Sequence, residues 1–80
     1  MYMAVKEVKT QNDYTLLLRY KNGELRQFDM KPYLELGIFQ ELKDPLMFNT
    51  VKPSFDSIEW ANEADLDPEI LYKNSIRIND

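Results

Sequence analysis

The sequence predicts a small α+β domain, in which an antiparallel sheet of about five strands is combined with short helical turns and a C-terminal helix. Three observations favour this class. Apolar and aromatic runs alternate with turn signals near the N-terminus, an Asn-Gly pair separates two of these runs, and two Asp-Pro pairs mark later helix starts. No repeat, linker or low-complexity tract interrupts the 80 residues, so we expect one domain over residues 1–80.

The first predicted strand covers residues 3–10, where Met3, Val5 and Val8 are mixed with charged residues. The spacing between Val5 and Val8 breaks strict alternation, which predicts a β-bulge. Asn12-Asp13 is a turn signal, and the apolar and aromatic residues 14–20 predict the second strand.

Asn22-Gly23 predicts a hairpin, whose register depends on the length of its loop. A two-residue loop would pair Tyr20 with Leu25. A three-residue loop, with Gly23 in the left-handed conformation, would pair Tyr20 with Glu24. A one-residue slip exchanges the two faces of a strand, so the choice decides which side chains are buried. We prefer the three-residue loop, because it aligns the apolar residues on one face: Tyr14, Leu16, Leu18, Phe28 and Met30.

The return strand, residues 24–30, is expected to end before Pro32, which has no N–H group to donate to a neighbouring strand. Short helical segments should follow over residues 32–36, around Ile38, Phe39 and Leu42 beyond a stop at Gly37, and after the Asp44-Pro45 N-cap.

A second hairpin is predicted from the alternation of apolar residues on both sides of residues 56–57. We expect Asp56-Ser57 to form its turn and Trp60 to lie opposite Phe55, packed in the core. Asp67-Pro68 predicts the cap and first turn of a helix that ends near Asn74, and Ile76 and Ile78 predict a short edge strand.

The charge distribution bears on the kind of partner. The chain has a net charge of −4, and residues 32–80 hold ten acidic against four basic residues. Nucleic-acid binding by the isolated domain is therefore not expected, since it depends on neutralising phosphates with Lys and Arg. A small basic protein is the expected partner, although the same charge would also simply keep the domain in solution.

Several classes of site and location are disfavoured. There is no Cys and no His, so disulfides and the common zinc sites are excluded, and no serine lies in a nucleophile-elbow motif. The N-terminus does not resemble a signal peptide, and no apolar run approaches the roughly 20 residues of a membrane helix. We expect a cytoplasmic protein that is not an enzyme, uses no cofactor and does not bind membranes.

Carboxylates provide two weak candidates for chemistry. The stretch Glu63, Asp65, Asp67 and Glu69 has alternate carboxylates that a hard cation could bind, but it lacks the glycine and distal glutamate of a calcium loop. A structural role is favoured, with Asp67 as a helix cap. Asp29 and Glu59 could form an acid–base pair only if the fold brought them together.

Partner binding is the more plausible use of the remaining polar and aromatic residues. Aromatic side chains are enriched at interaction hot spots, but they also fill the cores of small domains. For Tyr20 and Tyr33, both beside turns, we weigh the two roles equally. The candidate partner-binding residues lie at the first hairpin, shortly after it and in the acidic stretch: Arg19, Tyr20, Arg26, Tyr33, Asp65 and Glu69.

Several of these motifs together resemble a bacterial family called Domain of Unknown Function 2442. The matching segments are Asn22-Gly23-Glu24, Arg26, Phe28-Asp29-Met30, Pro32-Tyr33-Leu34, Gly37-Ile38-Phe39, Leu42, Phe48, Ile58-Glu59-Trp60, Ala64 to Pro68, and Leu71-Tyr72. The resemblance covers nearly the whole chain, and the run from Trp60 to Tyr72 is its most specific part. One departure is Glu63-Ala64, where the family often carries an Asn-Gly turn.

The resemblance implies a small α+β fold and no established activity. Members are often encoded beside another small protein, in an arrangement similar to a toxin–antitoxin pair. Some carry an added helix-turn-helix domain, for which the sequence up to Asp80 offers no room.

Two functional hypotheses follow. The first is an antitoxin-like interaction module that binds a small basic protein encoded nearby. The second is a DNA-associated regulator that acts as a dimer or through a partner, using the basic residues of the first hairpin: Arg19, Lys21, Arg26 and Lys31.

Overall fold

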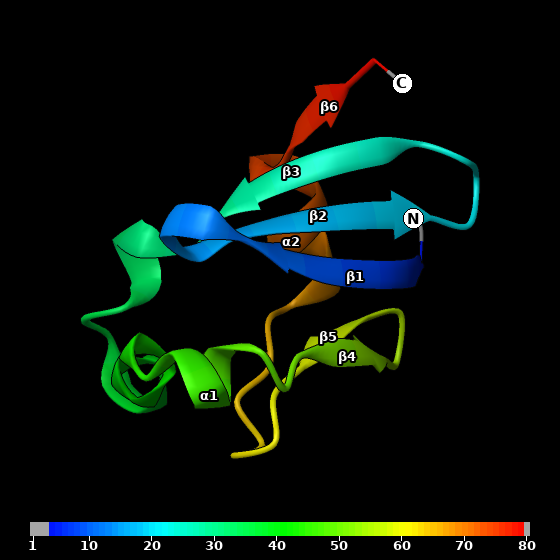
Figure 1. The fold of residues 1–80 in the computed structure, drawn as a ribbon. Helices are drawn as coiled ribbons and strands as arrows, with labels where there is room; N and C mark the ends of the chain where they lie inside the picture. Colours follow the sequence, from blue (N-terminus) through cyan, green and yellow to red (C-terminus); the bar gives the residue numbers. More distant parts are fainter. Residues whose placement is uncertain (1–3, 80) are drawn as a thin grey trace.

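The chain forms two antiparallel sheets connected by short helices (Figure 1). The computed structural model describes residues 4–79. The larger sheet has the strand order β1-β2-β3-β6, and the smaller one pairs β4 with β5. The α+β class is confirmed, but the strands of the described region number six and are divided between two sheets. Their bounds are β1 Val5–Gln11, β2 Thr15–Tyr20, β3 Leu25–Asp29, β4 Lys52–Ser54, β5 Ser57–Glu59 and β6 Ile76–Ile78.

Strand β1 contains the expected bulge. Its register against β2 shifts between Val5 and Glu7, which confirms the irregularity inferred from the apolar spacing. Met3, placed by the prediction in the same strand, lies outside the described residues. A 3₁₀ turn, Asn12–Tyr14, connects the two strands, with Asp13 in the left-handed region at φ 67°. Asp and Asn tolerate this conformation better than most residues, which explains the turn signal.

The register of the β2–β3 hairpin confirms the three-residue loop. Leu16 pairs with Phe28 and Leu18 with Arg26. The Tyr20 amide donates to the Glu24 carbonyl over 2.9 Å, and Gly23 has a φ of +91°. This register places the predicted apolar residues on the buried face of the sheet, among them Leu16, Leu18, Phe28 and Met30.

Three short helices follow β3, as the prolines and the glycine predict. They are η2 Lys31–Tyr33, η3 Gly37–Lys43 and α1 Pro45–Phe48. Gly37, where the sequence predicted the first segment to stop, is the first residue of η3 and has a positive φ of 47°. Asp44 caps α1, because its carboxylate accepts a hydrogen bond from the Leu46 amide over 3.0 Å.

The second hairpin turns one residue earlier than expected. Its loop is Phe55-Asp56, with Ser54 paired to Ser57, so the predicted turn at Asp56-Ser57 is wrong. Phe55 consequently does not face Trp60: its side chain is 95% exposed, whereas Trp60 is only 1% exposed.

Trp60 is a core residue, as predicted. Its indole N–H donates to the Phe48 carbonyl over 3.0 Å, and its ring stacks on that of Phe48. The edge of Phe39 completes this aromatic contact. Trp60 thus attaches the smaller sheet to helices η3 and α1.

Helix α2, Pro68–Asn74, begins at the predicted cap, where the Asp67 carboxylate accepts hydrogen bonds from the Glu69 and Ile70 amides. It lies behind the larger sheet (Figure 1) and contributes the fully buried Leu71 to the core. Strand β6 then pairs with β3, which confirms the predicted edge strand. Within residues 4–79, no helix is long and apolar enough to cross a membrane.

Replacement of Gly23 by alanine tests the hairpin loop. No atom lies within 4 Å of the position a Cβ would occupy, so the cost comes from the left-handed backbone alone. We expect Gly23→Ala to lower the free energy of unfolding by about 1–2 kcal/mol, measured by urea denaturation. Gly23→Asn is the control and should lose less, because Asn tolerates this conformation. Unchanged stability of the alanine variant would contradict the loop assignment.

Candidate functional site

Tyr20, one of the candidate binding residues, belongs to the core. It is 1% exposed, and its ring meets the edge of Tyr72 with 5.1 Å between centroids. Burial raises the pKa of the Tyr20 hydroxyl to about 12, and that hydroxyl has no hydrogen-bond partner among the described residues. A partner could therefore not contact Tyr20 without displacing neighbouring side chains.

Arg26 is engaged in a half-buried polar network near the start of β3, close to the hairpin loop. Its guanidinium forms an ion pair with Glu24 at 2.7 Å and lies over the Tyr72 ring at 4.2 Å from the centroid. It also donates to the Ser75 hydroxyl and to the carbonyls of Tyr72 and Ser75. Arg26 thus joins the N-terminal hairpin to the C-terminal end of α2.

The same network predicts a pH dependence of stability. Hydrogen bonds from Arg26, Tyr72 and Asn22 hold the pKa of Glu24 below its ordinary value of 4.5. A carboxyl whose pKa is lower in the folded state stabilises the fold above its unfolded pKa, and this contribution disappears as the pH falls. We expect Glu24→Gln to be less stable than the unsubstituted protein at pH 7, with the difference shrinking below about pH 4. Urea denaturation measures the free energy of unfolding of both proteins at pH 7 and below about pH 4. An equal difference between the two proteins at both pH values would contradict the assignment.

Three further candidates, from β2, η2 and α2, already have intramolecular contacts. Arg19 is half-buried and donates to the Gly23 carbonyl over 2.9 Å. Tyr33 stacks against Phe28, and its hydroxyl accepts a hydrogen bond from Asn74. Glu69 pairs with Lys73 one turn along α2, at 3.0 Å.

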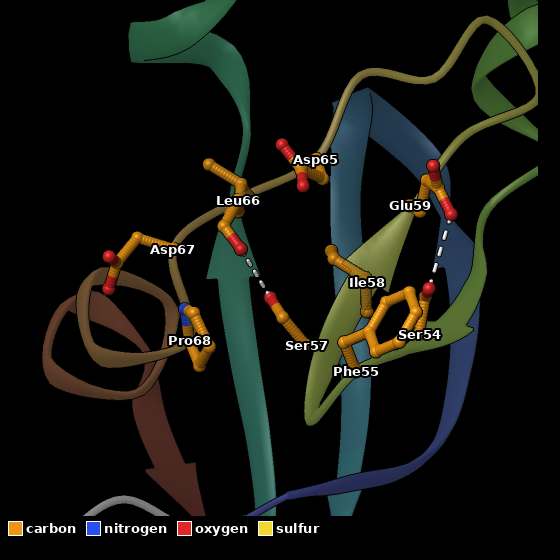
Figure 2. A pocket seen from close by; sticks show the side chains of 9 residues that line it. All are labelled: Ser54, Phe55, Ser57, Ile58, Glu59, Asp65, Leu66, Asp67 and Pro68. Carbon is orange, nitrogen blue, oxygen red and sulfur yellow. Dashed lines mark hydrogen bonds between the residues drawn. The ribbon is translucent and has the colours of Figure 1, made fainter.

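Asp65, in contrast, lies at a hollow of about 450 Å³ between β5 and residues 65–68 (Figure 2). The hollow combines four apolar or aromatic residues with three carboxylates: Phe55, Ile58, Leu66, Pro68, Glu59, Asp65 and Asp67. Asp65 and Asp67 are exposed, whereas Ile58 is fully buried and belongs to the floor. We take this hollow as the candidate functional site.

The hollow exists because β5 and the following chain separate after a single bridge. Glu59 and Asp65 face each other in an antiparallel bridge. Beyond it the Ser57 hydroxyl, rather than a backbone group, spans the gap and donates to the Leu66 carbonyl over 2.6 Å. Ser54 donates to the Glu59 carboxylate over 3.1 Å (Figure 2).

The electrostatic character of the hollow is acidic. Directly opposed like charges are unfavourable, so the pair Glu59 and Asp65 favours a cationic neighbour. Lys52 lies opposite Glu59 on the other side, in β4. Residues 4–79 contain no group of three or more ligating side chains that could hold a metal ion. The arrangement is suited to bind a positively charged group through two carboxylates.

Asp29 and Glu59 are not brought together as an acid–base pair. They lie in different sheets, and each has a separate partner: Lys31 at 3.0 Å from Asp29, and Ser54 for Glu59. The sequence identified Asp65 but missed Phe55 and Glu59 at the same hollow. Phe is rarely found in tight turns, so its residue type did not indicate that Phe55 lies in the loop. Only the general preference of hairpins for two-residue loops could have suggested Phe55-Asp56.

Comparison with known proteins identifies the family. A family model described as a protein of unknown function (DUF2442) matches residues 5–77. The chain belongs to the DUF2442 family. No curated protein and no solved structure matches this DUF2442 chain. The resemblance inferred from the motifs is therefore confirmed, and the family itself establishes no activity.

The departure from the family pattern at Glu63 does not open the turn. The Glu63 amide donates to the Trp60 carbonyl, and the Trp60 amide donates to the Ala64 carbonyl, each over 2.9 Å. Glu63 adopts a φ of 72°, and Asn62 accepts a hydrogen bond from the Ala64 amide. The DUF2442 protein thus keeps a tight turn here with a non-glycine residue in the left-handed region.

Phe55 is the most unusual feature of the hollow. It is nearly fully exposed, and with Asp56 it forms a loop whose two residues both have positive φ, 46° and 70°. Such loops strongly favour Asn-Gly, and a bulky residue in this region is strained. An exposed aromatic ring on a strained backbone contributes little to folding, and strain of this kind concentrates at functional sites.

Replacing Phe55-Asp56 by Asn-Gly should therefore stabilise this DUF2442 protein. We expect the free energy of unfolding to rise by about 1 kcal/mol, because both residues then suit the turn and no buried surface is lost. Urea denaturation measures the change, with Asp56→Gly alone as the control. A loss of stability would mean that the Phe55 ring packs against the fold.

Proposed function

We propose that this DUF2442 protein is an interaction module that binds a small basic protein, in the manner of an antitoxin in a two-gene system. The observation that carries the proposal is the exposed Phe55 at the edge of the acidic hollow. A large exposed aromatic residue beside a concave surface is typical of a protein-binding site, where aromatic anchors supply most of the binding energy.

Charge supports the choice of a basic partner. Glu59 and Asp65 are bridge partners at the hollow, and three more acidic residues lie within four positions of one or the other in the sequence: Asp56, Glu63 and Asp67. An acidic surface attracts a basic protein and speeds its association, most strongly at low salt. The partner of an antitoxin-like protein would be held by such contacts together with the apolar contact of Phe55.

Binding is better supported than catalysis. General acid–base chemistry relies on groups held in a shielded environment, whereas Asp65 and Asp67 are open to solvent. Asp67 also has a structural task as the cap of α2. The hydroxyl of Ser57 is directed to the Leu66 carbonyl, away from any nucleophilic role.

The DNA-associated regulator receives less support from the basic hairpin. Arg26 points into the half-buried network with Glu24. Lys31 forms ion pairs with Asp13 at 3.3 Å and with Asp29 at 3.0 Å. These contacts neutralise part of the positive charge that phosphate binding would need.

Charge reversal at Asp65 tests the interaction module. The tagged protein is used to capture its partner from native lysate at low and moderate salt, and the retained proteins are identified by mass spectrometry. We expect one small basic protein in stoichiometric amount, with an affinity for the Asp65→Lys variant at least about tenfold lower. Glu7→Lys, an equal charge change at an exposed residue of β1, is the matched control and should bind normally.

Two results would contradict the proposal. Capture that is equal for the Asp65→Lys variant and the unsubstituted protein would exclude the hollow as the contact surface. Retention of nucleic acid alone, lost steeply as salt rises, would instead favour the regulator.

A further inference from the structure

We propose that the hollow receives an arginine side chain of the partner, with its guanidinium between the carboxylates of Glu59 and Asp65 and its aliphatic stem along Phe55. This inference rests on the proposed function and specifies what the site recognises. It is argued from the bridge geometry, the position of Phe55 and the chemistry of the lining.

The carboxylate pair provides the first argument. Residues directly opposite in an antiparallel bridge have Cβ atoms about 4.5–5.5 Å apart, so the two carboxylates can approach one planar cation from both sides. A guanidinium carries five N–H donors in a fixed fork and can donate to both groups at once. The ammonium of lysine is a more strongly hydrated point charge and fits a paired acceptor less well.

The position of Phe55 provides the second argument. Figure 2 shows its ring at the hairpin end of the hollow, with the Glu59 and Asp65 carboxylates toward the opposite end. Two residues of strand, from Ser57 to Glu59, span about 7 Å, which suits the long stem of an arginine. Apolar stems of basic side chains pack on aromatic surfaces while their charged ends reach polar groups.

The lining of the hollow is better suited to bind a protein side chain than a free metal ion. Calcium needs six to eight oxygen ligands, and residues 4–79 provide no group of three or more ligating side chains for it. Glu59 already accepts a hydrogen bond from Ser54, which fixes its carboxylate and leaves further acceptor sites open. The carboxylates of Glu59 and Asp65 can therefore accept hydrogen bonds from the donors of a partner.

The test is a titration of the ¹⁵N-labelled protein with the blocked tripeptide Ac-Ala-Arg-Ala-NH₂, followed by two-dimensional NMR. Two matched peptides carry lysine or citrulline, the uncharged analogue of arginine. We expect amide shifts at residues 54–59 and 65–68, with a millimolar dissociation constant for arginine, severalfold weaker binding for lysine and none for citrulline.

Variants of the protein locate the contact. Asp65→Asn should abolish the shifts and Phe55→Ala should weaken binding severalfold, whereas Glu7→Gln should leave it unchanged. Asp65 and Phe55 are both exposed, so the spectra should retain the pattern of the folded protein and confirm that loss of binding is not loss of structure.

Absent shifts, equal binding of citrulline and arginine, or shifts confined to the outer face of the larger sheet would each overturn the inference. Equal binding of lysine and arginine would overturn its specificity for a guanidinium. These failures differ from failure of the proposed function, because capture of the basic partner and its sensitivity to Asp65→Lys are measured without the peptides.

Discussion

The burial of Ile58 and Trp60 is the interaction on which the candidate site depends. Strands β4 and β5 have three residues each, and an isolated two-stranded hairpin is marginal in water at best. The hairpin keeps its place because Ile58 and Trp60 are buried in the shared core and the Trp60 indole is bonded to Phe48. The amide of Val5 also donates to the Asp56 carbonyl, which joins β1 to the loop of the hairpin. The hollow is therefore fixed by the core, although its lining includes three carboxylates.

The residues of this segment that stabilise the fold differ from those that are available to a partner. Ile58 and Trp60 point into the core, while Glu59 lies between them in sequence and belongs to the opposite face of the strand. Phe55 lies beyond the core, in a loop whose conformation a phenylalanine adopts only with strain. Proteins often retain such locally unfavourable residues where binding requires them, at some cost in stability. Arg26 and Tyr20 contribute to the fold and not to the site, because Arg26 is paired with Glu24 and Tyr20 is buried.

The sequence predicted the elements whose signals are local. The register around Gly23, the caps at Asp44 and Asp67, and the edge strand at Ile76 all follow from turn chemistry and periodicity, and the structure has each of them. The loop at Phe55 was missed because neither its backbone strain nor its exposure is visible in the residue type. The pairing of Glu59 with Asp65 was missed because it depends on a turn at Glu63, which carries no glycine. Tyr20 was ambiguous because an aromatic residue beside a turn serves a core and an interface equally well.

Amide hydrogen exchange of the complex is the most direct test of the central claim, that the acidic hollow beside Phe55 is the surface that binds a basic partner. The measurement compares the free protein with the protein bound to the captured partner, residue by residue. The account predicts added protection at residues 54–59 and 65–68, with little change on the outer face of β1 and β2. Protection confined to that outer face or to the edge of β6, with the hollow unchanged, would contradict it.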